Sequence, residues 1–184
     1  MKILLGISNH HVHVTKEALE ALFGKNYKLN VKRNLKQPGE FAAEETVILQ
    51  KGDKIIEHVR VIGPCRTYTQ VELLQKDCDY LGINAPVRTS SYLDNSETLT
   101  MIGPAGKYEA KSEVIVSNKH IHLTNEHLKS LNKENGDIVD VMINGILVKD
   151  VHLKANDNYS LEMHINKDEA EKLCLENDME VTIC

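Results

Sequence analysis

Hydrophobic and polar residues alternate over short stretches along most of the chain, and this period of two predicts β-strands. Two pairs of stretches are joined by turn sequences, Gly52-Asp53 and Asn144-Gly145, which predict hairpins. We expect about nine or ten short strands in all. The stretches with the clearest pattern are residues 3–7, 45–50, 54–62, 99–102, 108–116, 137–143, 146–153, 159–165 and 179–183.

Three short helices are predicted between these strands. Thr15 is placed to cap the first helix and Gly24 to end it, Thr124 precedes the second, and Asn166 precedes the third. The strands do not alternate regularly with helices, so a doubly wound parallel sheet is not indicated. We predict a mainly β fold with short helices, arranged as two small β-barrels or sandwiches.

An eight-residue stretch occurs twice and suggests that these domains arose by internal duplication. SNHHVHVT at residues 8–15 returns as SNKHIHLT at residues 117–124. Each copy follows an apolar stretch and leads into a predicted helix, which is the signature of a repeated structural unit. We divide the chain into residues 1–95, which carry the first H-x-H motif, and 96–184, which carry the second. The boundary is poorly marked, and strands shared between the barrels stay an open alternative.

Each copy contains two histidines separated by one residue, and this spacing suggests metal binding. Residues i and i+2 of a strand point to the same side, so His11 with His13, and His120 with His122, can present nitrogens to one point. Neutral imidazole is a common ligand of zinc. His164 is a candidate further ligand from its place in an alternating strand, although a surface histidine explains it equally well.

Three other charged side chains are candidates for binding, each with an ordinary alternative. Glu72 alternates with apolar neighbours, as a metal ligand or a solvated strand residue would. Arg60 and Arg66 flank the Gly63-Pro64 turn, where a fixed guanidinium could bind phosphate in bidentate fashion. Exposed arginines are the alternative. The chain has neither a phosphate-binding P-loop motif nor a serine nucleophile motif.

Composition narrows the classes of partner. The 184 residues are 41% hydrophobic, with a net charge of -5, no Trp and two Phe, so nucleic-acid binding is not indicated. No apolar stretch is long enough for a membrane span, and we see no secretory signal. The four cysteines show no C-x-x-C spacing and are expected to be reduced thiols. We therefore expect a cytoplasmic protein without a membrane partner, and leave a homo-oligomer open.

Several further motifs, taken together with the H-x-H copies, resemble those of the PduL-type phosphate acyltransferases, also called phosphate propanoyltransferases. The resemblance runs in order through nearly the whole chain. The matching segments are QPGEFAAEET at 37–46, VRVIGPCR at 59–66, TQVE at 69–72, APVR at 85–88 and LEMHI at 161–165.

The resemblance implies two β-barrels and two divalent metal ions, expected to be zinc. By position, His11, His13 and Glu72 would bind one ion. Arg66 would bind phosphate and act in catalysis. The other ion would be bound by His120, His122 and His164, and the CoA site would be lined by Gly6, Ile7, Ser8 and Arg60.

The activity that the resemblance implies is the interconversion of a short-chain acyl-CoA and phosphate with acyl phosphate and CoA. Acetyl-CoA and propanoyl-CoA are both candidate substrates, with phosphate attacking a metal-polarised thioester directly. Related microcompartment enzymes carry an N-terminal targeting helix, and none is evident here. Two alternatives stay open: a dinuclear metallohydrolase that uses water as nucleophile, and a metal-binding or scaffold protein of duplicated barrels.

Overall fold

The computed structural model describes residues 2–184, and that part of the chain contains fourteen strands and four short helices. The strands are β1 Ile3–Ser8, β2 His11–His13, β3 Val31–Asn34, β4 Phe41–Lys51, β5 Lys54–Gly63, β6 Gln70–Leu73, β7 Val87–Arg88, β8 Glu97–Ile102, β9 Lys107–Ser117, β10 His120–Leu123, β11 Ile138–Ile143, β12 Ile146–Ala155, β13 Glu162–Asn166 and β14 Glu180–Ile183. The helices are α1 Lys16–Phe23, α2 Gln75–Leu81, α3 Asn125–Leu131 and α4 Lys167–Lys172.

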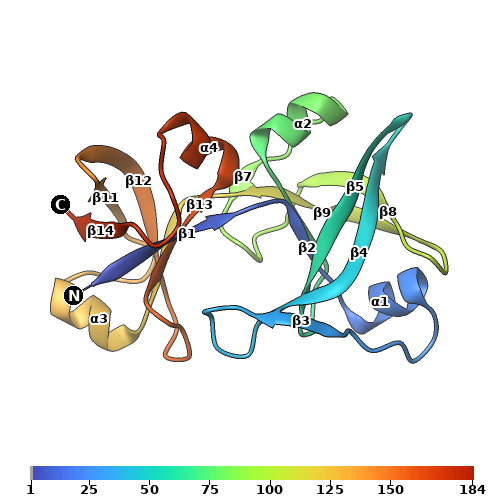
Figure 1. The fold of residues 1–184 in the computed structure, drawn as a ribbon, viewed down its shortest axis with the longest axis horizontal. Coiled ribbons are helices and arrows are strands. Elements are labelled where there is room, and N and C mark those ends of the chain that lie inside the picture. The colour runs from blue at the N-terminus through green and yellow to red at the C-terminus, as the bar shows by residue number, and fades with distance from the viewer. Residues whose placement is uncertain (1) are drawn as a thin grey trace. The chain divides into compact units, whose positions relative to one another are not determined.

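The chain forms two compact units, and each unit contains one closed barrel (Figure 1). The C-terminal unit consists of Asn118–Cys184 together with the residues up to Asn9, and its barrel has the strand order β1-β13-β10-β12-β11-β14. The central unit is His10–Ser117, and its six-membered ring runs β4-β5-β2-β6-β9-β8 and back to β4. The predicted mainly β fold of two small barrels is confirmed.

These units do not follow the predicted division into residues 1–95 and 96–184. Strand β1 precedes the first H-x-H motif in sequence, yet it pairs in parallel with β13 and antiparallel with β14 of the C-terminal unit. Strand β9 precedes the second motif, yet it pairs with β6 and β8 of the central unit. Each repeat therefore supplies its first strand to the barrel that contains the other H-x-H motif.

The two barrels share one pairing scheme around their H-x-H strands. Strand β2 pairs in parallel with β5 and antiparallel with β6, and β10 pairs in the same two ways with β12 and β13. In register, His11 lies opposite Glu72 and His120 lies opposite His164. The alternating residues Val12 and Ile121 are fully buried in the two cores. The duplication inferred from sequence therefore extends to the partners of each histidine.

Even an irregularity of the strands is repeated. The β4–β5 pairing shifts between Val47 and Leu49, and the β11–β12 pairing shifts at the corresponding place, between Val139 and Val141. Beside these shifts His58 (φ 57°) and Asp150 (φ 59°) both have left-handed backbone. A bulge increases local twist and curvature, so the same device shapes both barrels.

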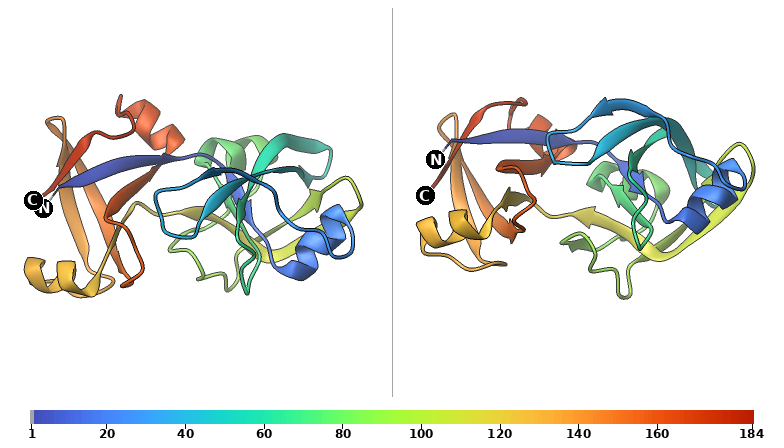
Figure 2. Two further views of the ribbon diagram at one scale, coloured as in Figure 1. Left: turned by 60° about the horizontal axis from the view of Figure 1, so that its bottom comes forward. Right: turned by 90° about the horizontal axis from the view of Figure 1, so that it is seen from below.

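The predicted helix caps Thr15 and Thr124 are confirmed for α1 and α3. The Thr15 hydroxyl accepts from the amide of Ala18 at 3.1 Å, and the Thr124 hydroxyl accepts from the amide of His127 at 3.3 Å. Helix α1 lies against the β8–β9 hairpin, where the amide of Ala105 donates to the carbonyl of Leu22 at 2.9 Å (Figure 2). None of the helices among residues 2–184 has the length and apolar character that crossing a membrane requires.

Helix α2 was not predicted from the sequence. It begins directly after β6, and the residue at its N-cap is Leu74, which has no capping oxygen. Instead the Asp77 carboxylate reaches back to accept from the amide of Leu74 at 3.0 Å. The start signal is therefore inside the helix rather than before it.

Candidate functional site

His11, His13 and Glu72 form a compact cluster on the wall of the central barrel. Because β2 and β6 are neighbours in register, the three side chains project from the face opposite to the buried Val12 and Val71. Their ligand atoms all lie within 4.8 Å of one another. The Nε2 atom of His11 is 3.6 Å from Glu72 Oε2, and that of His13 is 3.8 Å from Glu72 Oε1.

The electrostatic environment keeps this cluster suited to a cation. Burial, together with His11 and the Arg66 guanidinium, holds the pKa of His13 well below its ordinary value, while Glu72 acts in the opposite direction. The side chain of His13 is only 4% exposed. A neutral imidazole keeps a lone pair for a metal, and two imidazoles with one carboxylate are a donor set that zinc favours. The residues therefore fit a divalent cation.

Two buried polar residues hold the Glu72 carboxylate in place. The Gln70 amide donates to Glu72 Oε1 at 2.6 Å, and the Ser90 hydroxyl donates to the same oxygen at 3.0 Å. Gln70 also accepts from the amide of Ser91 at 2.8 Å, which fixes its own orientation. Such outer partners orient a ligand. Sequence analysis missed both: Gln70 shares the face of Glu72, but Ser90 carries no local signal.

Arg66 lies beside this cluster and is itself held by neighbours. Its Nη2 is 2.7 Å from Glu40 Oε1, and its Nη1 donates to the Tyr68 hydroxyl at 3.2 Å. Although burial opposes it, Tyr68, Glu40 and then Glu72 raise the pKa of Arg66 above its ordinary value, so the guanidinium stays charged. With 24% of its side chain exposed, Arg66 offers a fixed positive group to an anion. The sequence did not reveal Glu40 as a partner of Arg66. Glu40 would have to share the guanidinium with a bound anion.

His120, His122 and His164 form a second group on the wall of the C-terminal barrel. The ring centroids of His120 and His164 are 5.2 Å apart, and His122 lies 4.7 Å from His120 and 4.8 Å from His164. Of the described residues, only the first cluster has its ligand atoms within 4.8 Å, so the nitrogens here are more widely spaced. The structure thus brings the three predicted rings together without the tight donor geometry.

The tautomer of His120 is set by its backbone. Its Nδ1 is 2.8 Å from the carbonyl oxygen of Asn118. A carbonyl can only accept, so Nδ1 carries the proton and Nε2 carries the lone pair. The ring of His122 packs against Tyr159, with centroids 4.3 Å apart. These contacts orient two of the three rings, and in His120 they leave Nε2 available for binding.

The residues expected near CoA lie beside the two histidine groups. In the C-terminal unit, Gly6 is in register with His164, and the Ser8 hydroxyl is 3.4 Å from His164 Nδ1. Ile7 packs against the core, and its amide donates to the Asn177 side chain at 2.8 Å. In the central unit, Arg60 is in register with His11. Its Nη1 donates to the carbonyls of residues 43 and 44, at 3.0 and 2.8 Å.

The four remaining histidines belong to neither of these groups. His10 contacts Asp77, with Nδ1 2.9 Å from Oδ2. His127 Nδ1 accepts from the amide of Thr124 at 3.2 Å, as part of a helix cap. His58 is the exposed bulge residue of β5. His152, on β12, is in register with His120. It has the position that Arg60 has in the central barrel.

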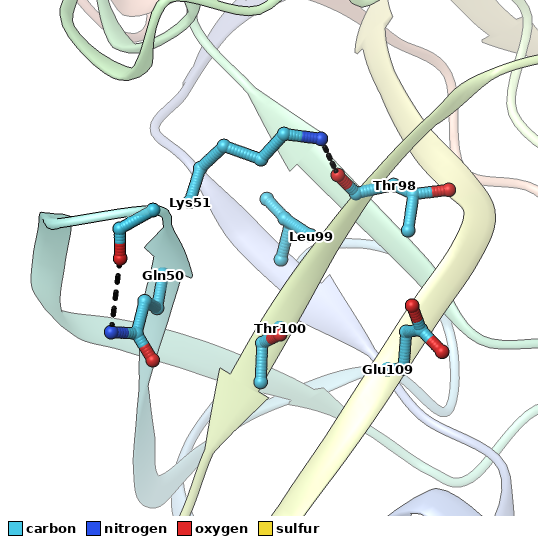
Figure 3. A pocket seen from close by; sticks show the side chains of 7 residues that line it. Gln50, Lys51, Thr98, Leu99, Thr100 and Glu109 are labelled. Carbon is cyan, nitrogen blue, oxygen red and sulfur yellow. Dashed lines mark hydrogen bonds between the residues drawn. The ribbon is translucent and has the colours of Figure 1, made fainter.

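A shallow hollow of about 340 Å³ opens elsewhere on the central unit (Figure 3). It is lined by Gln50, Lys51, Gly52, Thr98, Leu99, Thr100 and Glu109. The ammonium of Lys51 donates to the Thr98 carbonyl at 2.5 Å and lies 3.7 Å from Glu97, so its charge is already engaged. None of the predicted site residues lines this hollow.

Glu113 of the central unit leads to a prediction about stability. The Tyr108 hydroxyl donates to Glu113 Oε1 at 3.2 Å, whereas Oε2 is buried with no hydrogen-bond partner among residues 2–184. Burial raises the pKa of Glu113 from 4.5 to about 7. Ionisation therefore opposes folding increasingly as pH rises from about 4.5 through 7. We expect Glu113→Gln to stabilise the protein at pH 8, by about 1–2 kcal/mol after allowing for solvent screening, but hardly at pH 4.5.

Urea unfolding at the two pH values measures this difference. Glu109→Gln, a change of an exposed carboxylate on the same strand, is the matched control and should show no such pH dependence. Equal effects of Glu113→Gln at both pH values would contradict the assignment.

Comparison with known proteins gives consistent matches across both units. A family model described as phosphate propanoyltransferase matches residues 4–176. A phosphate propanoyltransferase of Rhodopseudomonas palustris is 41% identical over 186 residues, covering 100% of this chain and 82% of that protein. That of Thermotoga maritima is 38% identical over 172 residues, covering 91% and 82%. That of Rhodobacter capsulatus is 41% identical over 184 residues, covering 97% and 85%.

Proposed function

Because the chain belongs to the phosphate propanoyltransferase family and is an acyltransferase, we propose that it interconverts a short-chain acyl-CoA and phosphate with acyl phosphate and CoA. Acetyl-CoA and propanoyl-CoA are the acyl donors that we propose. The observation that carries the proposal is the cluster of His11, His13 and Glu72 with the charged guanidinium of Arg66 beside it. This arrangement combines ligands for a cation with a binding group for an oxyanion.

We assign two divalent cations to the two histidine groups. We propose zinc because imidazole and carboxylate donors suit this ion. His11, His13 and Glu72 would hold one cation, and His120, His122 and His164 the other. When bound, such cations supply Lewis acidity that polarises a thioester carbonyl or stabilises a thiolate. The orientation of Glu72 by Gln70 and Ser90, and of His120 by Asn118, supports this assignment because ligands that are fixed in advance bind more tightly.

Arg66 would bind phosphate and place it for attack. Its two terminal nitrogens can contact two phosphate oxygens. The bound phosphate would either displace the Glu40 carboxylate from Arg66 or bind to Arg66 alongside it. A phosphate oxygen then forms a bond to the acyl carbon while the carbon–sulfur bond breaks, and CoA leaves as the thiolate. Positioning of this kind converts an encounter into a directed reaction. No acyl-enzyme is needed, because phosphate itself is the nucleophile.

CoA would be bound by Gly6, Ile7, Ser8 and Arg60. In the C-terminal unit Gly6 and Ser8 border His164, and in the central unit Arg60 is in register with His11. We propose a cytoplasmic location, with acyl-CoA, CoA and phosphate as partners and neither nucleic acid nor a membrane.

A thiol-release assay tests the function. Acetyl-CoA and propanoyl-CoA are each supplied to the protein loaded with zinc, with and without phosphate, and free CoA and acyl phosphate are measured. We expect release that depends on phosphate and equal amounts of the two products. Release without phosphate would support the metallohydrolase alternative. Absence of both release and CoA binding would support the scaffold alternative.

A further inference from the structure

The residue directly before each H-x-H motif contacts an acidic residue of a nearby helix. In the central unit, Nδ1 of His10 is 2.9 Å from Oδ2 of Asp77 on α2. In the C-terminal unit, Nζ of Lys119 is 3.0 Å from Oε1 of Glu169 on α4. Helix α2 follows β6 and helix α4 follows β13, the two strands that carry the remaining proposed ligands. We call these two contacts the end contacts.

The end contacts occupy corresponding positions of the internal repeat. His10 and Lys119 each stand directly before the first histidine of their motif. Asp77 and Glu169 are each the third residue of their helix, and each lies five residues beyond the proposed ligand on the preceding strand. The two repeats make the contact with different side chains. This indicates that both need the link itself rather than one particular residue.

Each end contact lies just beyond the end of a short strand pairing, and proposed ligands form the last pair of that pairing. The β2–β6 pairing ends with His11 opposite Glu72. The β10–β13 pairing ends with His120 opposite His164. The ends of short pairings open most easily, whereas a metal site needs its ligands held to within about 0.5 Å. These two ends are therefore where the ligand positions most need support.

In the central unit, one carboxylate oxygen links the two strands. Oδ2 of Asp77 accepts from the amide of Leu74 at 3.0 Å and also contacts His10. Leu74 lies two residues beyond Glu72 along the chain, and His10 lies one residue before His11. The contact is mostly shielded, since the side chains of His10 and Asp77 are 19% and 10% exposed. Asp77 thus limits movement of the strand end that carries His11 relative to the one that carries Glu72.

In the C-terminal unit, the end contact holds the segment that orients a proposed ligand. The carbonyl oxygen of Asn118, the residue before Lys119, is 2.8 Å from Nδ1 of His120. The carbonyl of Lys119 accepts from the amide of His152 at 2.9 Å. The side chains of Lys119 and Glu169 are 21% and 38% exposed, so their ion pair adds little to the stability of the fold. Placing this segment against β13 explains the contact better than overall stability does.

We propose that His10 and Lys119 are positioning residues for the two cations of the proposed function, on which this inference rests. Each links the strand that carries an H-x-H motif to the helix that follows the strand with the remaining ligand. Each link thereby keeps the terminal ligand pair of its barrel together. The ammonium of Lys119 has no lone pair to donate, so this position acts through its neighbours and not as a ligand. Each end contact acts on the site in its own unit.

Zinc titration of the purified metal-free protein, in competition with a chromophoric chelator, tests the proposal without reference to activity. Lys119→Met keeps a long side chain but loses the charge. It should lower the zinc affinity of the C-terminal site by about 10-fold, the lower end of what loss of an outer partner costs, and leave the central site unchanged. His10→Ala should have the converse effect. Glu72→Gln, which removes a ligand of the central site, shows which affinity belongs to which unit.

Two variants that break contacts within the same helices are matched controls. Lys167→Met removes the contact with Glu171, 3.8 Å away along α4. Gln75→Ala removes the hydrogen bond to Asp79 along α2, of 3.1 Å. Neither contact links its helix to a strand with an H-x-H motif, so both zinc affinities should equal those of wild type.

Conservative variants separate positioning from general stability. His10→Lys and Lys119→Arg keep a donor for the acidic residue, so their zinc affinities should stay close to those of wild type. Glu169→Gln should weaken the same site as Lys119→Met. The double variant should fall no further than either single one, because both changes remove one contact. The urea midpoint of metal-free Lys119→Met should stay close to that of wild type, because an ion pair at this exposure contributes little to folding.

The outcomes separate this proposal from the proposed function. An unchanged affinity of the corresponding site in Lys119→Met or His10→Ala overturns the positioning role, whatever the thiol-release assay shows. A fall of both affinities in one variant, or an equal fall in the helix controls, also overturns it, because the effect would then be one of general stability. One weakened site in a protein without thiol release supports the end contacts and overturns the proposed function. A wild-type protein that binds no zinc overturns both the positioning role and the metal dependence of the proposed function.

Discussion

Replacing Arg66 with alanine is expected to lower phosphate-dependent thiol release by about 10²–10³-fold while both cations stay bound. The guanidinium is the positive group beside the first cluster, and it is fixed by Glu40 and Tyr68. Without it, phosphate loses both a bidentate partner and the charge that offsets its own. Initial rates at several phosphate concentrations, together with the zinc content of each variant, measure the effect.

Two further variants show whether charge or geometry matters. Arg66→Lys keeps the charge but loses the planar fork, so we expect an activity between those of wild type and Arg66→Ala. Arg33→Ala removes an exposed arginine on β3 and should leave the rate unchanged. Loss of zinc from Arg66→Ala, in proportion to loss of activity, would contradict a role in phosphate binding.

Removal of the cations by a chelator is expected to abolish thiol release, with a loss of about 10³-fold or more. The reason is that Lewis acidity at a thioester carbonyl contributes several kcal/mol to stabilisation of the transition state. Activity should return when Zn²⁺ is added after the chelator has been removed by dialysis. The rate and the zinc content are measured on the same samples before removal, after removal and after reloading.

The corresponding variant is Glu72→Gln. It removes the charged ligand of the first cluster but keeps its shape, so we expect the protein to retain one cation and lose most of its activity. The decisive control is the rate of thiol release by the metal-free protein, measured at pH 8. Full activity without zinc would contradict the assignment of both clusters.

Local sequence patterns predicted the positions of the imidazoles well. Alternation in β2 and β10 places His11 with His13, and His120 with His122, on the face opposite to the core residues Val12 and Ile121. Alternation made Glu72 and His164 candidates beside ordinary alternatives, and only the family resemblance implied that they are ligands. The structure places each in register with the first histidine of its motif. The identity of these residues as metal ligands stays a prediction.

The features that were missed depend on contacts between distant parts of the chain. Ser90 reaches Glu72 from a segment without regular structure, and Glu40 reaches Arg66 from the residue just before β4. Their roles arise from tertiary packing, which no local pattern encodes. Helix α2 was missed because Leu74 does not resemble an N-cap. Shared strands were left open as an alternative, but β1 and β9 could not be assigned to their barrels because strand length and apolar character do not specify a pairing partner.

The exchange of β1 and β9 has a consequence for the origin of the architecture. The first strand of each repeat pairs with strands of the barrel that contains the other H-x-H motif. A polypeptide with one repeat alone could therefore form this pairing only with the strands of a second molecule. The strand pairing is therefore the one that covalent fusion of two strand-exchanging copies would produce.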